Sequence, residues 1–458
     1  MEQIRENKMG TARMLPLILT MSLPAMFSML MQSFYNIVDS YFVAKVSEDA
    51  FTAVSLAFPV QNLLIAVAVG TAVGLNSLIS RRLGEGRREE ANAAAAHGIV
   101  LGLLSWLAFA VLGVLFTRMF FEAFTDSAEV IGMGCDYTYI ITIVSGGVFV
   151  EINMERILQA TGNMVYPMIF QLTGCIINII LDPLFIFGLL GVPAMGVAGA
   201  AVATVIGQIL ACALSLYIGL CKKHEVHITL KGFRMNGRIV RDIYAVGVPS
   251  IIMQSIGSFM VAGLNAILIS FSKAAVSVFG AYFKLQSFVF MPVFGLTHGV
   301  MPILGYNYGA GNRRRLLSGL KIGCLIALII MAAGTVLFWA APGALLRVFE
   351  ASDEMMSIGV PALRIISLCF IPAALGILFS TLFQAVGMGK NSLYISLLRQ
   401  LVVLLPCAFI FSKFGLAYVW YAFPAAEVVS LLTSLIMMRR IYREHIKTLV
   451  PLRGEAGI

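Results

Sequence analysis

The sequence has little charge. Only 12% of its 458 residues are Asp, Glu, Lys or Arg, whereas 59% are hydrophobic. Ordinary soluble domains carry about 25% charged residues. Apolar runs of about 20 residues or more recur along the chain, and each is long enough to cross a hydrocarbon core of about 30 Å. The composition therefore excludes an ordinary soluble protein and predicts a polytopic membrane protein.

Motifs for nucleotide-driven or enzymatic work are also missing. The sequence has no GxxxxGK[ST] and no hydrophilic segment large enough for a nucleotide-binding domain. This excludes ATP-driven transport by this chain alone and leaves an ion gradient, or the substrate's own gradient, as the driving force. There is no HExxH and no convincing nucleophile–base pair, so we expect neither an enzyme nor a bound cofactor.

The cysteines form no recognisable framework. There are seven, almost all inside apolar runs, and none is part of a CxxC pair. An odd, scattered set argues against disulfides and against a cysteine metal site. We expect free thiols that behave as small apolar side chains.

Apolar runs predict an all-α fold with twelve transmembrane helices. The predicted spans cover residues 14–42, 52–80, 94–117, 131–154, 164–187, 196–220, 241–270, 277–306, 317–341, 356–381, 391–412 and 416–438.

The sequence repeats at a fixed offset, which equals the separation in sequence between Pro24 and Pro249. Proline and glycine dominate the matches, because these residues fix backbone geometry that a repeat must preserve. Six spans per copy place both copies in the membrane in the same direction, as parallel repeats of a secondary transporter. The matched pairs are Pro24/Pro249, Gln61/Gln286, Gly70/Gly295, Gly74/Gly299, Gly84/Gly309, Gly86/Gly311, Gln159/Gln384, Ala160/Ala385 and Gly162/Gly387.

The net charge of +9 follows from membrane topology. With the N-terminus inside, the predicted inner loops and tails hold 24 Lys and Arg residues, Arg156 among them, against 5 in the outer loops. This is the positive-inside pattern. It predicts a multi-pass protein of the cell membrane that is surrounded by lipid and has both termini in the cytoplasm. The pattern indicates no role in nucleic-acid binding. Nothing in the sequence indicates a partner chain, so we expect a monomer.

The same pass along the chain predicts the domain organisation. Residues 1–220 form an N-lobe of six spans, and residues 241–440 form a C-lobe of six. The short basic segment 221–240 is a cytoplasmic linker, and residues 441–458 are a cytoplasmic tail.

Few ionisable residues lie inside the predicted spans, where a bare charge costs several kcal/mol. Asp182 follows Asn178 by four residues, which places both on one helix face. Pro183 leaves the carbonyl of Ile179 without its helical donor. Together these oxygen atoms suit Na⁺ or a carboxyl group that takes up H⁺, although a capped helix end at the interface remains an equal interpretation.

Asp39 is the only charge in the run from Met14 to Ala44. Gln32, Tyr35, Asn36 and Asp39 follow the spacing of one helical stripe, and such a stripe must face protein or water. The alternative is an interfacial acid whose carboxylate reaches water.

The second half carries cations in place of these acids. Lys284 and Arg364 cannot lie bare in lipid, so pairing with Glu427 or with backbone carbonyls is the simplest interpretation. The same interpretation applies to Arg399, and His298 is most simply a hydrogen-bonded structural residue.

Several strings resemble the multidrug and toxic compound extrusion (MATE) transporters, most closely the bacterial branch with MepA-like and DinF-like exporters. The likeness covers the whole chain. The strings are Asn178-Ile-Ile-Leu-Asp182-Pro183-Leu-Phe-Ile-Phe-Gly188, Gly196-Val-Ala-Gly-Ala-Ala, Leu83-Gly84-Glu-Gly86, Leu158-Gln-Ala-Thr-Gly162-Asn and Phe383-Gln-Ala-Val-Gly387.

The resemblance implies two six-helix bundles in a V that alternate between inward-open and outward-open states. It implies export of bulky, often cationic amphiphiles against entry of Na⁺ or H⁺. The family's N-lobe cation site carries over to Asp39, Asn178 and Asp182, with Thr204 a weaker match. Some members place an acid in the span where this chain has Gln254, so the resemblance favours coupling through the N-lobe.

Further residues are candidates for the substrate cavity and for hinges. Methionine suits a promiscuous wall, and Pro24 and Pro183 are the predicted hinges. The runner-up function is a lipid-linked oligosaccharide flippase of the same superfamily architecture, which Lys284 and Arg364 would serve. The cavity candidates are Met26, Met29, Gln32, Tyr35, Asn36, Gln61, Gln254, Lys284, Gln286 and Arg364.

Overall fold

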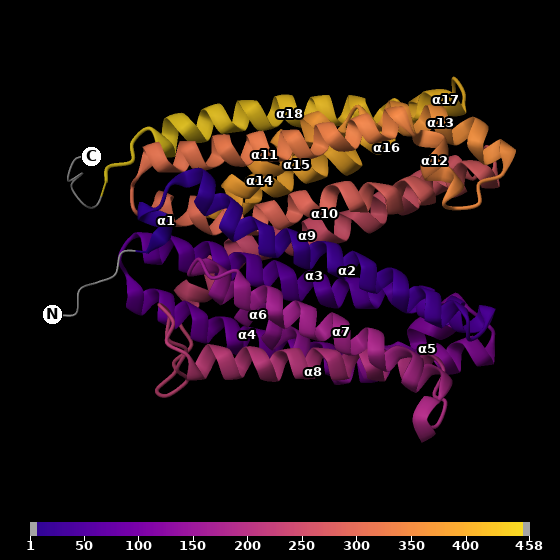
Figure 1. The fold of residues 1–458 in the computed structure, drawn as a ribbon, viewed down its shortest axis with the longest axis horizontal. Helices are drawn as coiled ribbons and strands as arrows, with labels where there is room; N and C mark the ends of the chain where they lie inside the picture. The colour runs from indigo at the N-terminus through magenta and orange to yellow at the C-terminus, as the bar shows by residue number, and fades with distance from the viewer. Residues whose placement is uncertain (1–6, 452–458) are drawn as a thin grey trace. The chain divides into compact units, whose positions relative to one another are not determined.

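The protein is built from helices. The computed structural model describes residues 7–451, and no strand occurs among them (Figure 1). The helices up to the predicted linker are α1 (Lys8–Thr11), α2 (Met14–Ala44), α3 (Glu48–Gly84), α4 (Arg88–Phe124), α5 (Ala128–Ile143), α6 (Gly146–Ala160), α7 (Val165–Phe187), η1 (Leu189–Gly191) and α8 (Val197–Cys221). The helices after it are α9 (Gly237–Leu268), α10 (Lys273–Gly309), α11 (Arg313–Ala340), α12 (Pro342–Arg347), α13 (Asp353–Ser367), α14 (Phe370–Ala385), α15 (Gly389–Leu397), η2 (Leu398–Leu404), α16 (Leu405–Ser412), α17 (Leu416–Val419), α18 (Ala422–Ile441) and η3 (Tyr442–Ile446).

The helices confirm the predicted fold class. In the described part of the chain, ten helical segments are long and apolar enough to cross a membrane, and the number is twelve if each bent pair counts as one span. The bent pairs are α5 with α6, at 45°, and α13 with α14, at 46°. Each of the twelve predicted spans coincides with one of these segments.

The repeat is visible in the helix bounds. α3 and α10 begin and end at positions related by the same offset as Pro24 and Pro249, and α6 and α14 end at matched alanines, Ala160 and Ala385. Gly86 and Gly311 have φ of 77° and 71° in the equivalent turns. This left-handed conformation is costly for any residue with a Cβ, which explains why the two glycines match.

Side-chain caps fix where several helices begin. Ser127 Oγ accepts from the N–H of Val130 at the start of α5, and Ser272 Oγ accepts from the N–H of Ala275 at the start of α10. Asn312 Oδ1 accepts from the N–H of Arg315 at the start of α11. Each cap satisfies an N–H that has no partner inside its helix.

Large apolar side chains point outward along the spans. On α4 the exposed fraction reaches 50% for Leu104, 55% for Leu107 and 60% for Leu115. A water-soluble protein rarely exposes such a continuous apolar face. The face is suited to lipid, in agreement with a multi-pass membrane protein.

The contacts divide the chain into two compact units that are discontinuous in sequence. Within the described residues, unit 1 comprises 7–26, 84–86 and 252–451, and unit 2 comprises 27–83 and 87–251. The chain thus changes unit within α2, after Met26, and within α9, after Ile251. These two positions are equivalent in the repeat, because Met26 and Ile251 each lie two residues after a matched proline.

Glycines let two helices approach closely in each unit. In unit 2 the first part of α9 packs on α3, where a Cβ added to Gly70 would lie 2.8 Å from the backbone nitrogen of Ile251. In unit 1 the first part of α2 packs on α10, where a Cβ added to Gly299 would lie 2.8 Å from the backbone nitrogen of Ser22. Such approaches need a residue without a side chain, which accounts for these glycines in the repeat.

Candidate functional site

α7 positions the first two polar groups of the site. Asn178 and Asp182 lie one turn apart and are 2% and 0% exposed. The helix ends at Phe187, where Gly188 adopts the left-handed conformation with φ of 73°. The two side chains therefore share a buried face inside unit 2, as their spacing predicts.

α8 supplies the partner of this pair. With the Asn178 amide oriented to satisfy its neighbours, its nitrogen donates to Asp182 Oδ2 at 2.8 Å. Its oxygen accepts from the hydroxyl and the backbone N–H of Thr204, both at 3.0 Å. Thr204 is 6% exposed. The structure thus places Thr204 in contact with Asn178, which in turn contacts Asp182.

Close helix packing makes this network possible. A Cβ added to Gly207 on α8 would lie 2.8 Å from the carbonyl oxygen of Gly174 on α7, and 3.6 Å from Asn178 Cβ. Small residues at such positions let two backbones approach, so that short polar side chains can reach across.

α2 brings a second acid to Asp182. The side chains of Asp39 and Asp182 interact with each other, and two carboxyl groups in contact form a hydrogen bond only when one of them carries a proton. The Oδ1 atom of each is buried and has no hydrogen-bond partner. Two neighbouring carboxyl groups with unsatisfied oxygen atoms can accept a proton or a small hard cation.

Hydroxyl groups surround the pair of acids. Tyr35 of α2 is hydrogen-bonded to the side chain of Thr204. Tyr137 of α5 is 3% exposed, donates to Gln61 Oε1 at 3.2 Å and interacts electrostatically with both Asp39 and Asp182. Tyr137 is not among the residues predicted from the sequence, although a tyrosine inside a predicted span is a signal that could have indicated it.

The polar stripe on α2 is only partly engaged. Gln171 of α7 donates to Gln32 Oε1 at 3.0 Å, which adds a contact one layer away from the acids. Asn36 is exposed. Of the four stripe residues, Tyr35 and Asp39 therefore join the site and Gln32 contacts α7.

The remaining cavity and hinge candidates are distributed over both units. Pro24 and Pro183 are inside helices α2 and α7. The exposed residues are Gln254, Lys284 and Arg364, and the half-buried ones are Met26, Met29 and Gln286. Met29, Gln32, Tyr35, Asn36 and Gln61 belong to unit 2 with Asp39 and Asp182, whereas Met26, Gln254, Lys284, Gln286 and Arg364 belong to unit 1.

Arg399 and Arg364, two cations of the second half, each have an interaction partner within unit 1. Arg399 Nη1 lies 3.5 Å from Glu427 Oε1 on α18, and Glu427 is 6% exposed. Arg399 belongs to η2, a π-helical stretch inside a span. The Arg364 side chain donates to the carbonyl of Trp339 at 3.4 Å. Pairing of Arg399 with an acid, and of Arg364 with a carbonyl, follows the simplest interpretation of the sequence.

One placement from the sequence is wrong. The charge count predicts Arg156 in a loop, but it lies in α6 and is only 4% exposed. Glu151 and Glu155 of the same helix are 9% and 8% exposed, and the sequence analysis misses them. The predicted span ends at residue 154, whereas α6 continues to Ala160, because a hydropathy window ends where charges begin even if the helix does not.

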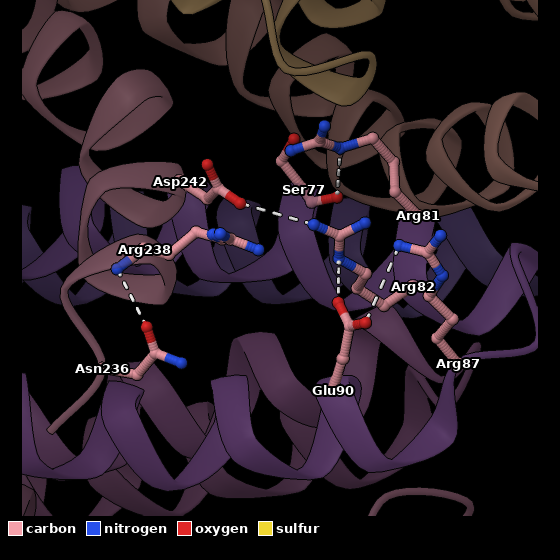
Figure 2. A network of polar contacts seen from close by, with 8 residues as sticks. All are labelled: Ser77, Arg81, Arg82, Arg87, Glu90, Asn236, Arg238 and Asp242. Atoms are coloured by element: carbon pink, nitrogen blue, oxygen red, sulfur yellow. Dashed lines mark hydrogen bonds and ion pairs between the residues drawn. The ribbon is translucent and has the colours of Figure 1, made fainter. Parts of the chain in front are cut away.

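A second polar network joins three helices of unit 2 (Figure 2). Arg82 at the end of α3 pairs with Glu90 of α4 at 3.0 Å and with Asp242 of α9 at 3.4 Å. Glu90 also pairs with Arg87 at 3.7 Å. A cavity of about 220 Å³ lies beside these groups, lined in addition by Leu78, Asn236, Arg238 and Ile239. The network ties the beginning of α9 to α3 and α4.

Metal-binding clusters are not a feature of the described chain. Among residues 7–451, no group of three or more His, Cys, Asp or Glu side chains could hold a metal ion.

Two parallel repeats with buried polar groups inside one bundle define the class: a polytopic membrane protein with the architecture of a secondary transporter. The profile of the MatE family matches residues 24–184 and 249–410, one segment in each repeat. The chain therefore belongs to the MatE family.

Known proteins of similar sequence and structure agree with this assignment. The chain is 26% identical over 411 residues to the multidrug export protein MepA of Staphylococcus haemolyticus, with 89% of each chain covered. It is 25% identical over 396 residues to an FAD transporter of Shewanella oneidensis, covering 85% of this chain and 86% of the relative. It matches the outward-facing structure of a multidrug resistance MATE family transporter of the MOP superfamily with a TM-score of 0.92 and 25% identity, over 98% of this chain and 100% of that one.

Proposed function

We propose that this protein exports amphiphilic, often cationic organic compounds across the cell membrane in exchange for Na⁺ or H⁺. Membership of the MatE family and similarity to proteins named multidrug export protein MepA support the direction and the substrate class. The positive-inside pattern supports a membrane orientation with both termini cytoplasmic. The protein would act as a single chain, with no enzymatic activity and no cofactor other than the coupling ion.

The observation that carries the proposal is the contact between Asp39 and Asp182. Their carboxyl groups interact directly, and each retains one buried oxygen atom without a hydrogen-bond partner. Two adjacent carboxylates repel each other in a medium of low dielectric constant. A proton or Na⁺ removes this repulsion, so the coupling ion changes the stability of the contact between α2 and α7.

The coupling step follows from that difference. An ion drives a conformational change only as far as it binds two states with different affinities. The bound ion favours the state in which α2 packs against α7 and α8, with Asn178 and Thr204 holding Asp182 in place. Packing of α2, with Pro24 as its hinge, would narrow the space within the N-lobe and release the substrate. When the ion leaves, repulsion between the acids favours the open arrangement.

Efflux from proteoliposomes tests the proposal. A cationic dye is loaded, and Na⁺ and pH gradients are imposed separately. We expect one gradient to drive efflux by the parent protein, and we expect Asp39→Asn and Asp182→Asn to abolish gradient-driven efflux while the purified variants remain folded. Asp126→Asn, which changes an exposed acid in the loop after α4, serves as the control and should retain the parental rate.

Two results of this assay would contradict the proposal. Normal gradient-driven efflux by both site variants would overturn the role of the two acids. Absence of dye efflux by the parent protein under either gradient, with transbilayer movement of a lipid-linked oligosaccharide instead, would replace the exporter with the flippase.

A further inference from the structure

A second group of buried polar side chains lies on α6, in unit 2. Glu151, Glu155, Arg156 and Gln159 are 9%, 8%, 4% and 2% exposed. Gln159 Nε2 donates to Glu155 Oε1 at 2.6 Å, and Arg156 Nη1 donates to Gln159 Oε1 at 3.0 Å. Buried ionisable groups inside a membrane bundle are costly and generally mark an ion or proton pathway.

Glu151 differs from the other members of this group. No hydrogen bond to its carboxyl group is found among the described residues, although it is nine-tenths buried. The charged groups that act on it are Glu155 and Arg156 of its own helix. Cys175 of α7 and Cys212 of α8 are the titratable groups of the neighbouring helices within its electrostatic range, and no group of α4 acts on it. A buried carboxylate without a hydrogen-bond partner is costly in its charged form.

One face of α7 connects Glu151 with the pair of acids. Cys175, Asn178 and Asp182 follow the spacing i, i+3, i+7, so they lie on the same side of the helix, and they are 7%, 2% and 0% exposed. The rise of an α-helix places Cys175 about 10 Å along the axis from Asp182. Glu151, near Cys175, therefore lies on the side of the acids that faces the beginning of α7.

The beginning of α7 lies on the side of the membrane that is predicted to be cytoplasmic. The side chain of Asn76, late in α3, donates to the carbonyl of Arg156 at 3.3 Å. The segment after α3 contains the basic turn that the positive-inside pattern places in the cytoplasm. The group on α6 thus lies between the two acids and the cytoplasmic ends of α3 and α6.

We propose that Glu151 is a second proton-binding group, which receives the proton leaving the Asp39–Asp182 pair on its way to the cytoplasm. The O–H bond at the aspartic acid breaks and a new O–H bond forms at Glu151, with water molecules bridging the distance between them. The proton then leaves to cytoplasmic water past Glu155, whose ionised form Arg156 and Gln159 stabilise. This inference rests on the proposed antiport function and specifies H⁺ as the coupling ion.

The charge balance of the α6 group supports this role. Arg156 compensates one carboxylate, and the hydrogen bond from Gln159 favours Glu155 as that carboxylate. Glu151 then has no cation of its own. Its carboxylate can take up a proton, and the resulting carboxylic acid can release it, without changing the pairing of Glu155, which suits a group that is loaded and unloaded once in each cycle.

Glu151→Gln tests the proposal, because it keeps the shape of the side chain and removes the proton site. We expect efflux driven by a pH gradient to slow by at least about tenfold, since transfer through a positioned group contributes that much or more. Dye counterflow, an exchange of substrate for substrate without net proton movement, should keep the parental rate. Glu151→Asp should restore most of the pH-driven efflux.

Two controls make each result decisive. Glu89→Gln alters an exposed acid of α4 and should leave both assays unchanged. If Glu151→Gln fails to fold, infrared difference spectra of the parent protein and Glu151→Asp provide the second measurement. A protonated carboxyl band that responds to pH and shifts in Glu151→Asp is expected, and a band that does not shift overturns the proposal.

The failure of this inference can be told from failure of the proposed function. Parental pH-driven efflux in Glu151→Gln would overturn the role of Glu151 and leave the antiport intact. Loss of counterflow together with pH-driven efflux in folded Glu151→Gln would show a structural role instead. Efflux by the parent protein under a Na⁺ gradient alone would also overturn the inference, whereas no driven efflux at all would defeat the antiport itself.

Discussion

Asn178 and Thr204 join α7 to α8 directly, with the amide oxygen of Asn178 3.0 Å from both the hydroxyl oxygen and the backbone nitrogen of Thr204. This contact fixes the orientation of the amide, so that its nitrogen faces Asp182. Thr204 belongs to the site because it determines which end of Asn178 the acid meets.

Removal of the Thr204 hydroxyl should weaken coupling without unfolding the protein. Thr204→Val keeps the shape of the side chain but loses its hydrogen bonds to Asn178 and Tyr35. A hydrogen bond contributes about 1 kcal/mol net, so we expect the apparent affinity for the coupling ion to fall by about three- to tenfold. The measurement is dye efflux as a function of Na⁺ concentration and of pH. Thr173→Val on α7, where the hydroxyl bonds the carbonyl of Ile169, is the matched control, and an equal loss in both variants would contradict the prediction.

A methyl group at Gly207 should separate α7 from α8. The new Cβ would lie 2.8 Å from a backbone oxygen of Gly174, which cannot move independently of its helix. We expect Gly207→Ala to lower the free energy of unfolding by about 1–3 kcal/mol, the usual cost of overpacking, and to reduce efflux. Thermal unfolding in detergent measures the first effect. Gly132→Ala on α5 meets open space and should be neutral or stabilising. The reverse order of stabilities would refute this account of the packing.

The pair between Arg399 and Glu427 should show strong coupling in a double-mutant cycle. Glu427 is almost fully buried, so Arg399→Met leaves its carboxylate without compensation, and Glu427→Gln leaves the arginine likewise. Removing one partner of a buried pair costs about 3–5 kcal/mol, whereas removing both costs less. We expect the double variant to be more stable than the sum of the single changes predicts. Additive losses, measured by thermal or denaturant unfolding, would mean that the two side chains act independently.

The network of Figure 2 should hold the beginning of α9. Arg82 bridges Glu90 and Asp242, and its side chain is only 20% exposed. Arg82→Met should therefore increase hydrogen exchange at the backbone of residues 237–251, measured by mass spectrometry. Arg87→Met removes a longer contact from a more exposed side chain and should have a smaller effect, since exposed ion pairs contribute little. Equal exchange in the parent and both variants would contradict a holding role.

Sequence patterns predict the spans and the repeat because both depend on composition and on proline and glycine. Asp39, Asn178 and Asp182 can also be predicted, since a buried acid is rare in an apolar run. Their meeting across α2 and α7 cannot be worked out from spacing, which describes one helix at a time. The resemblance to a known family supplies that step.

The group on α6 shows the limit of hydropathy. Three charges so close together normally mark a loop, which is why Arg156 is predicted in one and why Glu151 and Glu155 are overlooked. They are buried because α6, which follows a 45° bend after α5, packs against α4, α7 and α8. A bend at Val144 and Ser145 is a tertiary property that no local pattern reveals.

The exchange of helix segments between the units has a consequence for biosynthesis. α3 emerges from the ribosome early, but the part of α9 that packs on Gly70 and Gly74 is translated only after all of α4 to α8. Unit 2 therefore remains in the membrane with one face of α3 uncovered until the first part of α9 has been translated. A polypeptide truncated before residue 237 would lack that cover permanently, and one repeat would need a second copy of itself to provide it.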